Sequence, residues 1–294
     1  MHNNFPGKTM NNPGLESSLI NLIDNTAGRV GVCAETIDGK RKLAIHADEI
    51  YPTASSIKMY ILFTLLALSE RGSLSLEDRL EFTRQAAQPG SGVLYHMDPG
   101  LKLSLKDLAT LMMMISDNSA LIMLTGYLGL ETINAEIARL GLDSSLCGDW
   151  RKFDTDYADS LSFGSSTPRE FCDFLLRMQR AELLEGESTE MFWDILRIQK
   201  YILPLRRHLP ASPWSREFGF AEPVWVASKS GLLDDCASES GLVRVCDGGW
   251  VISIMAREMP QISGHPEIGE DLISAISLQI YQAWGPFYHT GESP

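Results

Sequence analysis

The segment from residue 56 to residue 70 (SIKMYILFTLLALSE) restricts the fold more than any other, because it has almost no polar face. A helix that is apolar all round exposes hydrophobic side chains to water in every surface orientation, so it belongs in a protein interior. Gly72 follows it, and glycine commonly ends a helix because it adopts the left-handed backbone conformation without strain. We therefore expect a buried central helix here, not one that lies on the surface.

This helix opens with Ser55-Ser56-Ile57-Lys58, the one Ser-x-x-Lys sequence in the chain. At a helix N-terminus, unpaired backbone N–H groups and the helix dipole favour negative charge developing on Ser55. Lys58 lies one turn later on the same face and can take the serine proton if burial lowers its pKa. The pair predicts an activated nucleophile. The alternative is a serine that caps the helix and a lysine whose amine reaches solvent.

A polar triplet, Ser116-Asp117-Asn118, separates the apolar segments 105–115 and 120–128. Polar side chains between two core helices are costly to bury unless they find hydrogen-bond partners. The triplet therefore indicates a polar site inside the protein. The alternative is a capping turn between two helices, with Asp117 or Asn118 as the cap.

A second lysine motif, Lys229-Ser230-Gly231, follows the alternating run 222–228 (EPVWVAS). Alternation of apolar and polar residues is typical of a strand, so the motif is predicted to end one. The alternative is a solvated strand end followed by a turn glycine.

In this order, the three motifs resemble the Ser-x-x-Lys, Ser-Asp-Asn and Lys-Thr-Gly signatures of the penicillin-recognising serine hydrolases, most closely those of class A β-lactamases. Ser230 stands where the family has threonine and keeps the hydroxyl. The resemblance covers roughly residues 20–285 and includes the approach to the nucleophile at 51–54. It also includes the segment 90–94 and a Thr-Pro helix start at 167–170.

The resemblance implies catalytic roles for the motif residues. Ser55 would be the acylated nucleophile, and Lys58 would be its general base. Ser116 would pass a proton to the leaving nitrogen or oxygen, while Asp117 would hold the motif from behind. Lys229 would attract a substrate carboxylate and help keep Lys58 neutral by like-charge repulsion.

The resemblance also implies how the substrate is bound. Asn118 would hydrogen-bond the substrate amide, and Ser230, next to Gly231, would hydrogen-bond its carboxylate. The backbone N–H of Leu232 would complete an oxyanion hole with that of the nucleophile, each donor contributing about 3 kcal/mol. Leu232 is larger than the residue common at this position and would narrow the pocket. Arg244 could add to carboxylate binding, although a charge at a strand end is the better reading.

One element of the class A pattern is missing. These enzymes carry Glu-x-x-Leu-Asn in an omega loop, where the glutamate activates the water that frees the acyl-enzyme. Between the Ser-Asp-Asn motif and Thr167 the glutamates are Glu131 and Glu136, both in a predicted helix. An aspartate of the expected loop could substitute with a shorter reach, although each alone is typical of a solvated loop acid. The candidates are Asp149, Asp154, Asp156 and Asp159.

Charge and composition exclude several classes of partner. The net charge of −13, with no basic stripe, would repel nucleic acid and anionic membranes. No run approaches the roughly 18 apolar residues of a membrane span, and no secretory signal is visible. Five cysteines without paired spacing favour reduced thiols. We expect a cytoplasmic monomer that binds a small acyl substrate without a cofactor or metal. A secreted or periplasmic protein would require that a signal had been removed.

The predicted fold class is α/β (α+β) of the β-lactamase/transpeptidase type, a five-stranded antiparallel sheet flanked by helices plus an all-helical subdomain. Strands are expected at residues 30–35, 42–46, 222–228, 241–246 and 250–256, and terminal helices at 16–25 and 268–284. Both chain ends therefore contribute to one sheet. The sheet subdomain would comprise residues 16–54 and 202–290, the helical subdomain 55–201, and a flexible N-terminus 1–15.

The favoured function is a serine β-lactamase-like hydrolase that acts through an acyl-enzyme on a β-lactam, amide or ester bearing a carboxylate. The first alternative is a D-Ala-type peptidase or acyltransferase, or a biosynthetic amidase or esterase, with slow deacylation. The second alternative is a penicillin-binding sensor that is acylated once and does not turn over.

Overall fold

The computed structural model describes residues 13–152, 159–200, 204–260 and 267–285, and the expected flexible N-terminus lies mostly outside these ranges. The α-helices are α1 (Pro13–Asp24), α2 (Lys58–Glu70), α3 (Leu105–Met114), α4 (Asn118–Leu128), α5 (Leu130–Arg139), α6 (Pro168–Gln179), α7 (Gly186–Arg197) and α8 (Glu267–Trp284). The long strands are β1 (Arg29–Thr36), β8 (Val224–Leu233), β9 (Cys236–Val245) and β10 (Gly248–Arg257). The short strands are β2 (Lys42–Ile45), β3 (Tyr51–Pro52), β4 (Arg79–Glu81), β5 (Lys102–Ser104), β6 (Leu146–Cys147) and β7 (Gly164–Ser166).

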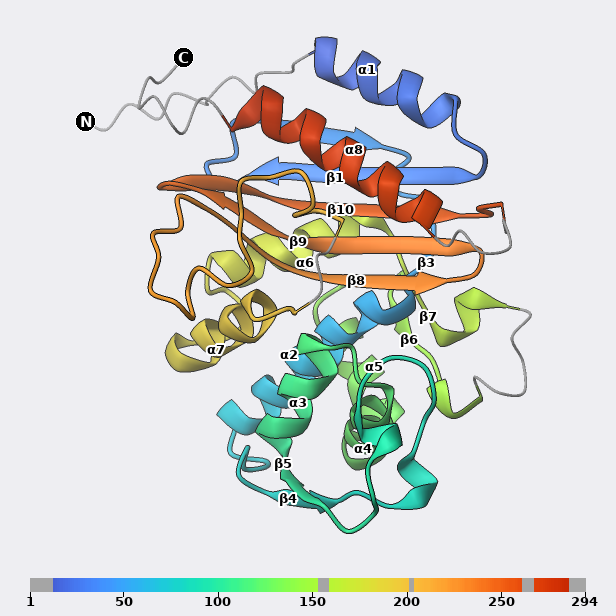
Figure 1. Ribbon diagram of the computed structural model, residues 1–294, viewed down its shortest axis with the longest axis vertical. Coiled ribbons are helices and arrows are strands. Elements are labelled where there is room, and N and C mark those ends of the chain that lie inside the picture. The colour runs from blue at the N-terminus through green and yellow to red at the C-terminus, as the bar shows by residue number, and fades with distance from the viewer. Residues whose placement is uncertain (1–12, 153–158, 201–203, 261–266, 286–294) are drawn as a thin grey trace.

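The main sheet has five strands in the order β2-β1-β10-β9-β8, and every neighbouring pair is antiparallel. Strands from the two ends of the chain meet at the β1–β10 pair, where Val32 faces Ile254. Both the predicted fold class and the assembly of the sheet from both chain ends are confirmed. Figure 1 shows α1 and α8 above the sheet and the other helices below it.

Both faces of the sheet are buried, and successive residues of a strand serve opposite faces. On β10, Trp250 and Ile252 pack with α1 and α8, whereas Val251 and Met255 belong to the larger core around α2. Helix α6 lies against this second face, where the Cys172 thiol donates to the Cys33 carbonyl at 2.9 Å. None of the five cysteines is in a disulfide.

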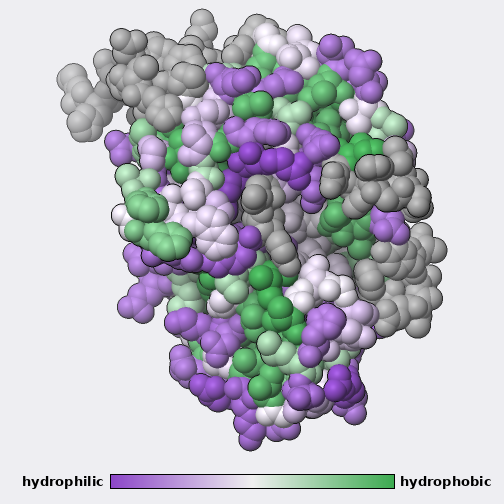
Figure 2. Space-filling model, in the orientation of Figure 1, coloured by the Kyte–Doolittle hydropathy of each residue, from purple (hydrophilic) through white to green (hydrophobic). Residues whose placement is uncertain are grey.

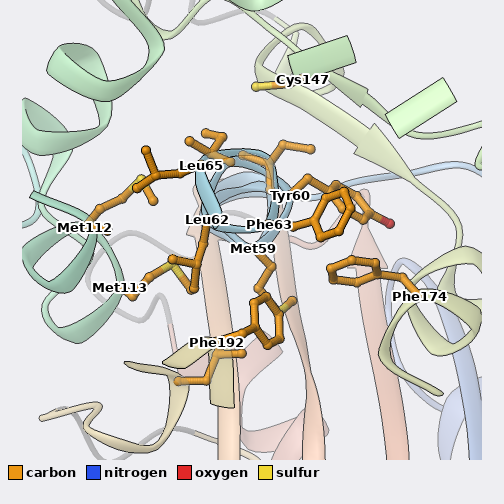
Figure 3. Close-up of a cluster of buried hydrophobic side chains, with 14 of the residues drawn as sticks. Met59, Tyr60, Leu62, Phe63, Leu65, Met112, Met113, Cys147, Phe174 and Phe192 are labelled. Carbon is orange, nitrogen blue, oxygen red and sulfur yellow. The ribbon is translucent and has the colours of Figure 1, made fainter. Parts of the chain in front are cut away.

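Helix α2 is the buried central helix that its sequence predicts, with every residue from Lys58 to Ala67 buried. Figure 3 looks along this helix, whose side chains point outward to α3 on one side and to α6 and α7 on others. Tyr60 stacks on Phe171 of α6 with ring centroids 4.7 Å apart, and Phe63 meets Phe174 edge-on at 5.6 Å. Because it is packed on all sides, α2 holds its first residue, Lys58, in a fixed position.

The Lys-Ser-Gly motif does not end a strand, contrary to the prediction. Strand β8 continues through the motif to Leu233, and its pairing with β9 places Lys229 opposite Ser240 and Gly231 opposite Ser238. The sequence alternation stops at Lys229, but Gly231 packs against the turn that carries Ser55 and Leu233 packs against the larger core, so the strand continues without it. Glycine here permits close approach, described below, and makes no turn.

The surface drawn in Figure 2 is hydrophilic at its upper and lower margins, and hydrophobic residues gather in its lower half, over the helical part of the molecule. The described part of the chain contains no helix both long and apolar enough to cross a membrane.

Candidate active site

Ser55 lies in η1 (Ala54–Ile57), the tight turn that leads from β3 into α2. Its side chain is partly exposed, and its hydroxyl has no hydrogen-bond partner among the described residues. The residue before it, Ala54, has φ of 43°, a left-handed conformation that costs free energy in a residue with a Cβ. The turn therefore presents an unengaged hydroxyl from a constrained backbone.

Hydroxyl groups fasten this turn to the sheet. The Ser56 hydroxyl donates to the backbone carbonyl of Lys229 at 2.8 Å and lies 2.9 Å from the Ser238 hydroxyl. Ser238 in turn donates to the carbonyl of Thr53 at 2.6 Å. Each hydroxyl has one hydrogen, so at most two of these three buried contacts are hydrogen bonds at any time, and they tie the turn that carries Ser55 to strands β8 and β9.

Gly231 brings the Lys-Ser-Gly motif against the turn that carries Ser55. A Cβ built on Gly231 would lie 2.4 Å from the Thr53 carbonyl oxygen and 2.6 Å from the backbone nitrogen of Ser55. Only glycine permits this approach. Its neighbours Ser230 and Leu232 are partly exposed, Leu232 by 40%, so this edge of the sheet is open to a substrate.

Lys58 is completely buried and is the centre of the polar site. Its Nζ donates to the Ser116 hydroxyl at 3.0 Å, to the Ser116 carbonyl at 2.8 Å and to Asn118 Oδ1 at 2.9 Å. The carbonyl and Oδ1 can only accept hydrogen bonds, whereas the hydroxyl can accept or donate. A neutral amine would donate its two hydrogens to the Ser116 carbonyl and to Asn118 Oδ1. Its lone pair would then be available to receive a proton.

The environment of Lys58 favours that neutral form. Burial lowers its pKa well below the ordinary 10.5, and the nearby charge of Lys229 lowers it further. The carboxylate of Asp117 opposes both effects without cancelling them. The first and third motifs therefore lie close enough to interact electrostatically, although residues 58 and 229 are far apart in sequence.

The Ser-Asp-Asn triplet both caps α4 and builds the site, so the two readings of its sequence are compatible. Ser116 has φ of 55°, a second left-handed residue of the site. Asp117 Oδ1 accepts from the backbone of Ala120, and its Oδ2 accepts from the backbones of Val93 and Leu94 at 2.7 and 3.0 Å. Asp117 thus ties the 90–94 loop to the site from behind.

Asn118 connects the same loop to Lys58. Its Nδ2 donates to the carbonyl of Pro89 at 3.0 Å, while its Oδ1 accepts from Lys58. A Cβ on Gly90 would lie 2.8 Å from Nδ2, so the loop must pass close to this amide. The second N–H of the amide is the group that remains for a substrate carbonyl.

Lys229 is buried beside a carboxylate that the sequence analysis missed. Burial lowers the pKa of Lys229 to about 7, against the opposing attraction of Glu239. Burial also raises the pKa of Glu239 to about 7, although its carboxylate accepts from the Ser228 hydroxyl at 2.6 Å and the Leu205 backbone at 2.9 Å. Lys229 Nζ itself donates to the Ser230 carbonyl at 2.6 Å. The pair makes the charge of this lysine sensitive to pH near neutrality.

Glu239 could have been found from one signal. A glutamate between serines in the segment 236–241 (CASESG) lies one hairpin away from Lys229-Ser230-Gly231. The predicted strand began at Gly241, so the segment was left outside the sheet, whereas β9 begins at Cys236 and carries Glu239 opposite Ser230.

Trp150, in the segment where the omega loop was expected, packs beside Lys58. It lies in η4 (Trp150–Lys152), is 3% exposed, and its ring centroid is 5.5 Å from Lys58 Nζ and 5.5 Å from the Phe163 ring. An aromatic ring supplies neither a base nor a strong hydrogen-bond acceptor. The side of Lys58 that this ring covers therefore carries no carboxylate from Trp150.

The aspartates proposed as substitutes are engaged elsewhere or lie outside the described residues. Asp149 pairs with Arg151 at 2.9 Å, and that hydrogen bond lowers the pKa of its carboxyl group. Asp159 accepts from the backbone of Leu161 at 3.1 Å and caps a short turn. Asp154 and Asp156 fall in the range 153–158, outside the described residues.

Arg244 is not brought to this site. It faces Trp225 near the far end of the β8–β9 pair and donates to the Asp247 carbonyl at 3.4 Å. This position agrees with its reading as a charge at a strand end.

The five-stranded sheet, the central helix and the three clustered motifs define the β-lactamase/transpeptidase class of proteins. The model of the beta-lactamase enzyme family (Beta-lactamase2) matches residues 14–284, so the chain belongs to that family. The resemblance noted from the motifs is thereby confirmed.

Solved structures show the same fold. PBP-A superposes with a TM-score of 0.80 at 22% identity, over 95% of this chain and 98% of that one. A β-lactamase from Sphaerobacter thermophilus gives 0.80 at 24% identity, over 92% and 97%. The TLA-1 extended-spectrum β-lactamase gives 0.80 at 18% identity, over 92% and 98%. No curated protein matches the sequence.

Proposed function

We propose that this member of the family is a Ser–Lys acyl-transferring enzyme, with Ser55 as nucleophile and Lys58 as general base. Its substrate is a β-lactam, amide or ester that bears a carboxylate near the scissile bond. The observation that carries the proposal is the buried Lys58 amine, hydrogen-bonded to Ser116 and Asn118 and depressed in pKa beside Lys229. An amine in that state accepts a proton near neutral pH, which an ordinary surface lysine does not.

Acylation proceeds in two proton transfers. Ser55 Oγ attacks the carbonyl carbon while its proton passes to Lys58, and the oxyanion binds the backbone N–H groups of Ser55 and Leu232. The proton then moves from Lys58 through Ser116, 3.0 Å away, to the leaving nitrogen or oxygen as its bond to the acyl carbon breaks. Lys229 and Ser230 bind the carboxylate, and protonated Lys229 is the form that attracts it.

Trp150 favours slow deacylation and hence the acyltransferase or peptidase alternative over a rapid β-lactamase. Hydrolysis of the Ser55 ester needs a water from which a base removes a proton. The apolar ring at Lys58 supplies no such base and excludes water from one side of the amine. A neutral amine is a stronger nucleophile than water and can attack the ester before it loses a proton, so acyl transfer depends less on a second base.

Intact-protein mass spectrometry after mixing with penicillin G or nitrocefin tests the proposal. An adduct on Ser55 that persists for minutes supports acylation with slow release, and its faster loss with an added D-amino acid supports transfer to an amine. Rapid return to the unmodified mass supports a hydrolase. An adduct that survives every acceptor supports the sensor alternative, and no adduct at all contradicts β-lactam recognition.

A further inference from the structure

A small cavity lies behind β8, away from Ser55, among α7, the segment after it and the first residues of the strand. It has a volume of about 30 Å³, and its walls include Arg197, Arg206, Arg216, Glu222 and Trp225. About 10–15 Å³ suffices for one water-sized probe. The enclosed part of the cavity therefore has room for one small ion or for one or two waters.

Two of the three arginines in its wall already have partners. Arg197 pairs with Glu222 and lies over the Trp225 ring, 4.1 Å from its centroid. Arg216 forms a two-pronged pair with Asp194, whose second contact is 2.9 Å. These carboxylates are engaged by those guanidinium groups, and Glu217, which also lines the cavity, pairs with Lys200. Within the described part of the chain, none of them forms an ion pair with the third arginine.

Arg206 is that third arginine, and it is 3% exposed. Its Nη2 donates to the Val226 carbonyl at 2.9 Å, but its buried Nε and Nη1 have no hydrogen-bond partner among the residues that the structure describes. Glu239 and Glu222 attract it only at longer range, because Glu239 accepts from Ser228 and the Leu205 backbone and Glu222 pairs with Arg197. A guanidinium stays charged in proteins, and burying it without a counter-charge is unfavourable.

We propose that this cavity binds one small inorganic monoanion of about the size of chloride, held by Nε and Nη1 of Arg206. The anion would supply the two missing acceptors and the missing negative charge together, whereas a water supplies only the acceptors. Anion binding here depends on the local arrangement of the Arg206 N–H groups, because the chain as a whole carries a net charge of −13 and repels anions. The site is independent of the chemistry proposed at Ser55.

Crystals of the full chain grown in sodium bromide provide the direct test. Data collected at the bromine absorption edge should show an anomalous peak within hydrogen-bond distance of Arg206 Nε and Nη1. A water without anomalous signal at that position would overturn the proposal.

Thermal unfolding at constant ionic strength provides the test in solution, with chloride exchanged for gluconate, which is too large for the cavity. For a site with a Kd of about 10 mM, 100 mM chloride should raise the melting temperature by about 3 °C. Arg206→Gln should lose this shift, and Arg207→Gln is the matched control, because Arg207 pairs with Glu270 and Asp271 outside the cavity. An equal chloride shift in both variants would contradict the site. If Arg206→Gln does not fold, Arg206→Lys replaces it, and the bromide test needs no variant.

Discussion

Replacing Trp150 by glutamate should convert slow deacylation into fast deacylation. A glutamate carboxyl group lies roughly as far from its Cα as the centre of an indole ring does. The indole centroid is 5.5 Å from Lys58 Nζ, a gap that one water spans with two hydrogen bonds of about 2.8 Å. The carboxylate would take a proton from that water as it attacks the Ser55 ester. A positioned general base contributes about 10²–10⁴-fold, so we expect deacylation to accelerate at least about 100-fold.

The same substitution should slow acylation. A carboxylate beside Lys58 favours its protonated form and raises its pKa, opposing the burial and the Lys229 charge that now lower it. Each unit by which that pKa exceeds the assay pH costs about tenfold in the reactive amine. Opposite changes in the two steps are the signature of this mechanism, because a general loss of structure would slow both.

Stopped-flow mixing with nitrocefin, followed by intact mass measurements over time, separates the two rates. Trp150→Gln is the matched control, because it has the shape of glutamate but no base. The ratio of deacylation rates between Trp150→Glu and Trp150→Gln isolates the carboxylate. A ratio near one in two folded, acylating variants would refute the assignment of this position to the water-activating side of the site.

Three further changes test the site and its electrostatics. Lys58→Met should lower the acylation rate by about 10³-fold in the mass assay. Circular dichroism should show a folded protein, because an apolar side chain of similar volume replaces a buried amine. Acylation at the rate of the parent protein would contradict Lys58 as the base. Gly231→Ala should destabilise the protein by about 2 kcal/mol and abolish acylation, because the new Cβ would lie 2.4 Å from the Thr53 carbonyl oxygen. Gly126→Ala is the control, because a Cβ there has no atom within 4 Å. Urea unfolding should show that it stabilises α4 by about 1 kcal/mol. Glu239 has its pKa raised from 4.5 to about 7 in the folded protein, so its ionisation should reduce the free energy of unfolding by about 3 kcal/mol as pH rises through that window. Urea titrations of Glu239→Gln should lack this decrease, and an unchanged pH profile would rule out Glu239 as its source.

Local sequence patterns predicted the elements that are defined by their own residues. The apolar run at 56–70 could form only a buried helix, and α2 is buried from Lys58 to Ala67. The almost wholly apolar segment 250–256 lies within β10, Gly248–Arg257, which is buried on both faces. In both cases the segment is apolar on every face, so its own composition predicts burial and no knowledge of its partners is needed.

The parts of the site that depend on partners were harder to predict. The end of β8 was misplaced because alternation stops at Lys229, although hydrogen bonding to β9 continues to Leu233. Glu239 was missed because the predicted strand began at Gly241, whereas β9 begins at Cys236. Trp150 was missed because nothing in its local sequence indicates that it contacts Lys58. These positions are determined by contacts between residues far apart in the chain, and local sequence patterns do not predict such contacts.

The hydroxyl chain from Thr53 through Ser238 and Ser56 to the Lys229 carbonyl has a consequence for biosynthesis. Its two halves come from opposite ends of the polypeptide, and the ribosome makes the second half long after the first. A chain that ends before residue 229 contains Ser55 and Lys58 but lacks the strands β8 and β9 that fix the turn carrying them. In a translation reaction, a fluorescent penicillin should therefore label full-length chains and leave truncated chains unlabelled.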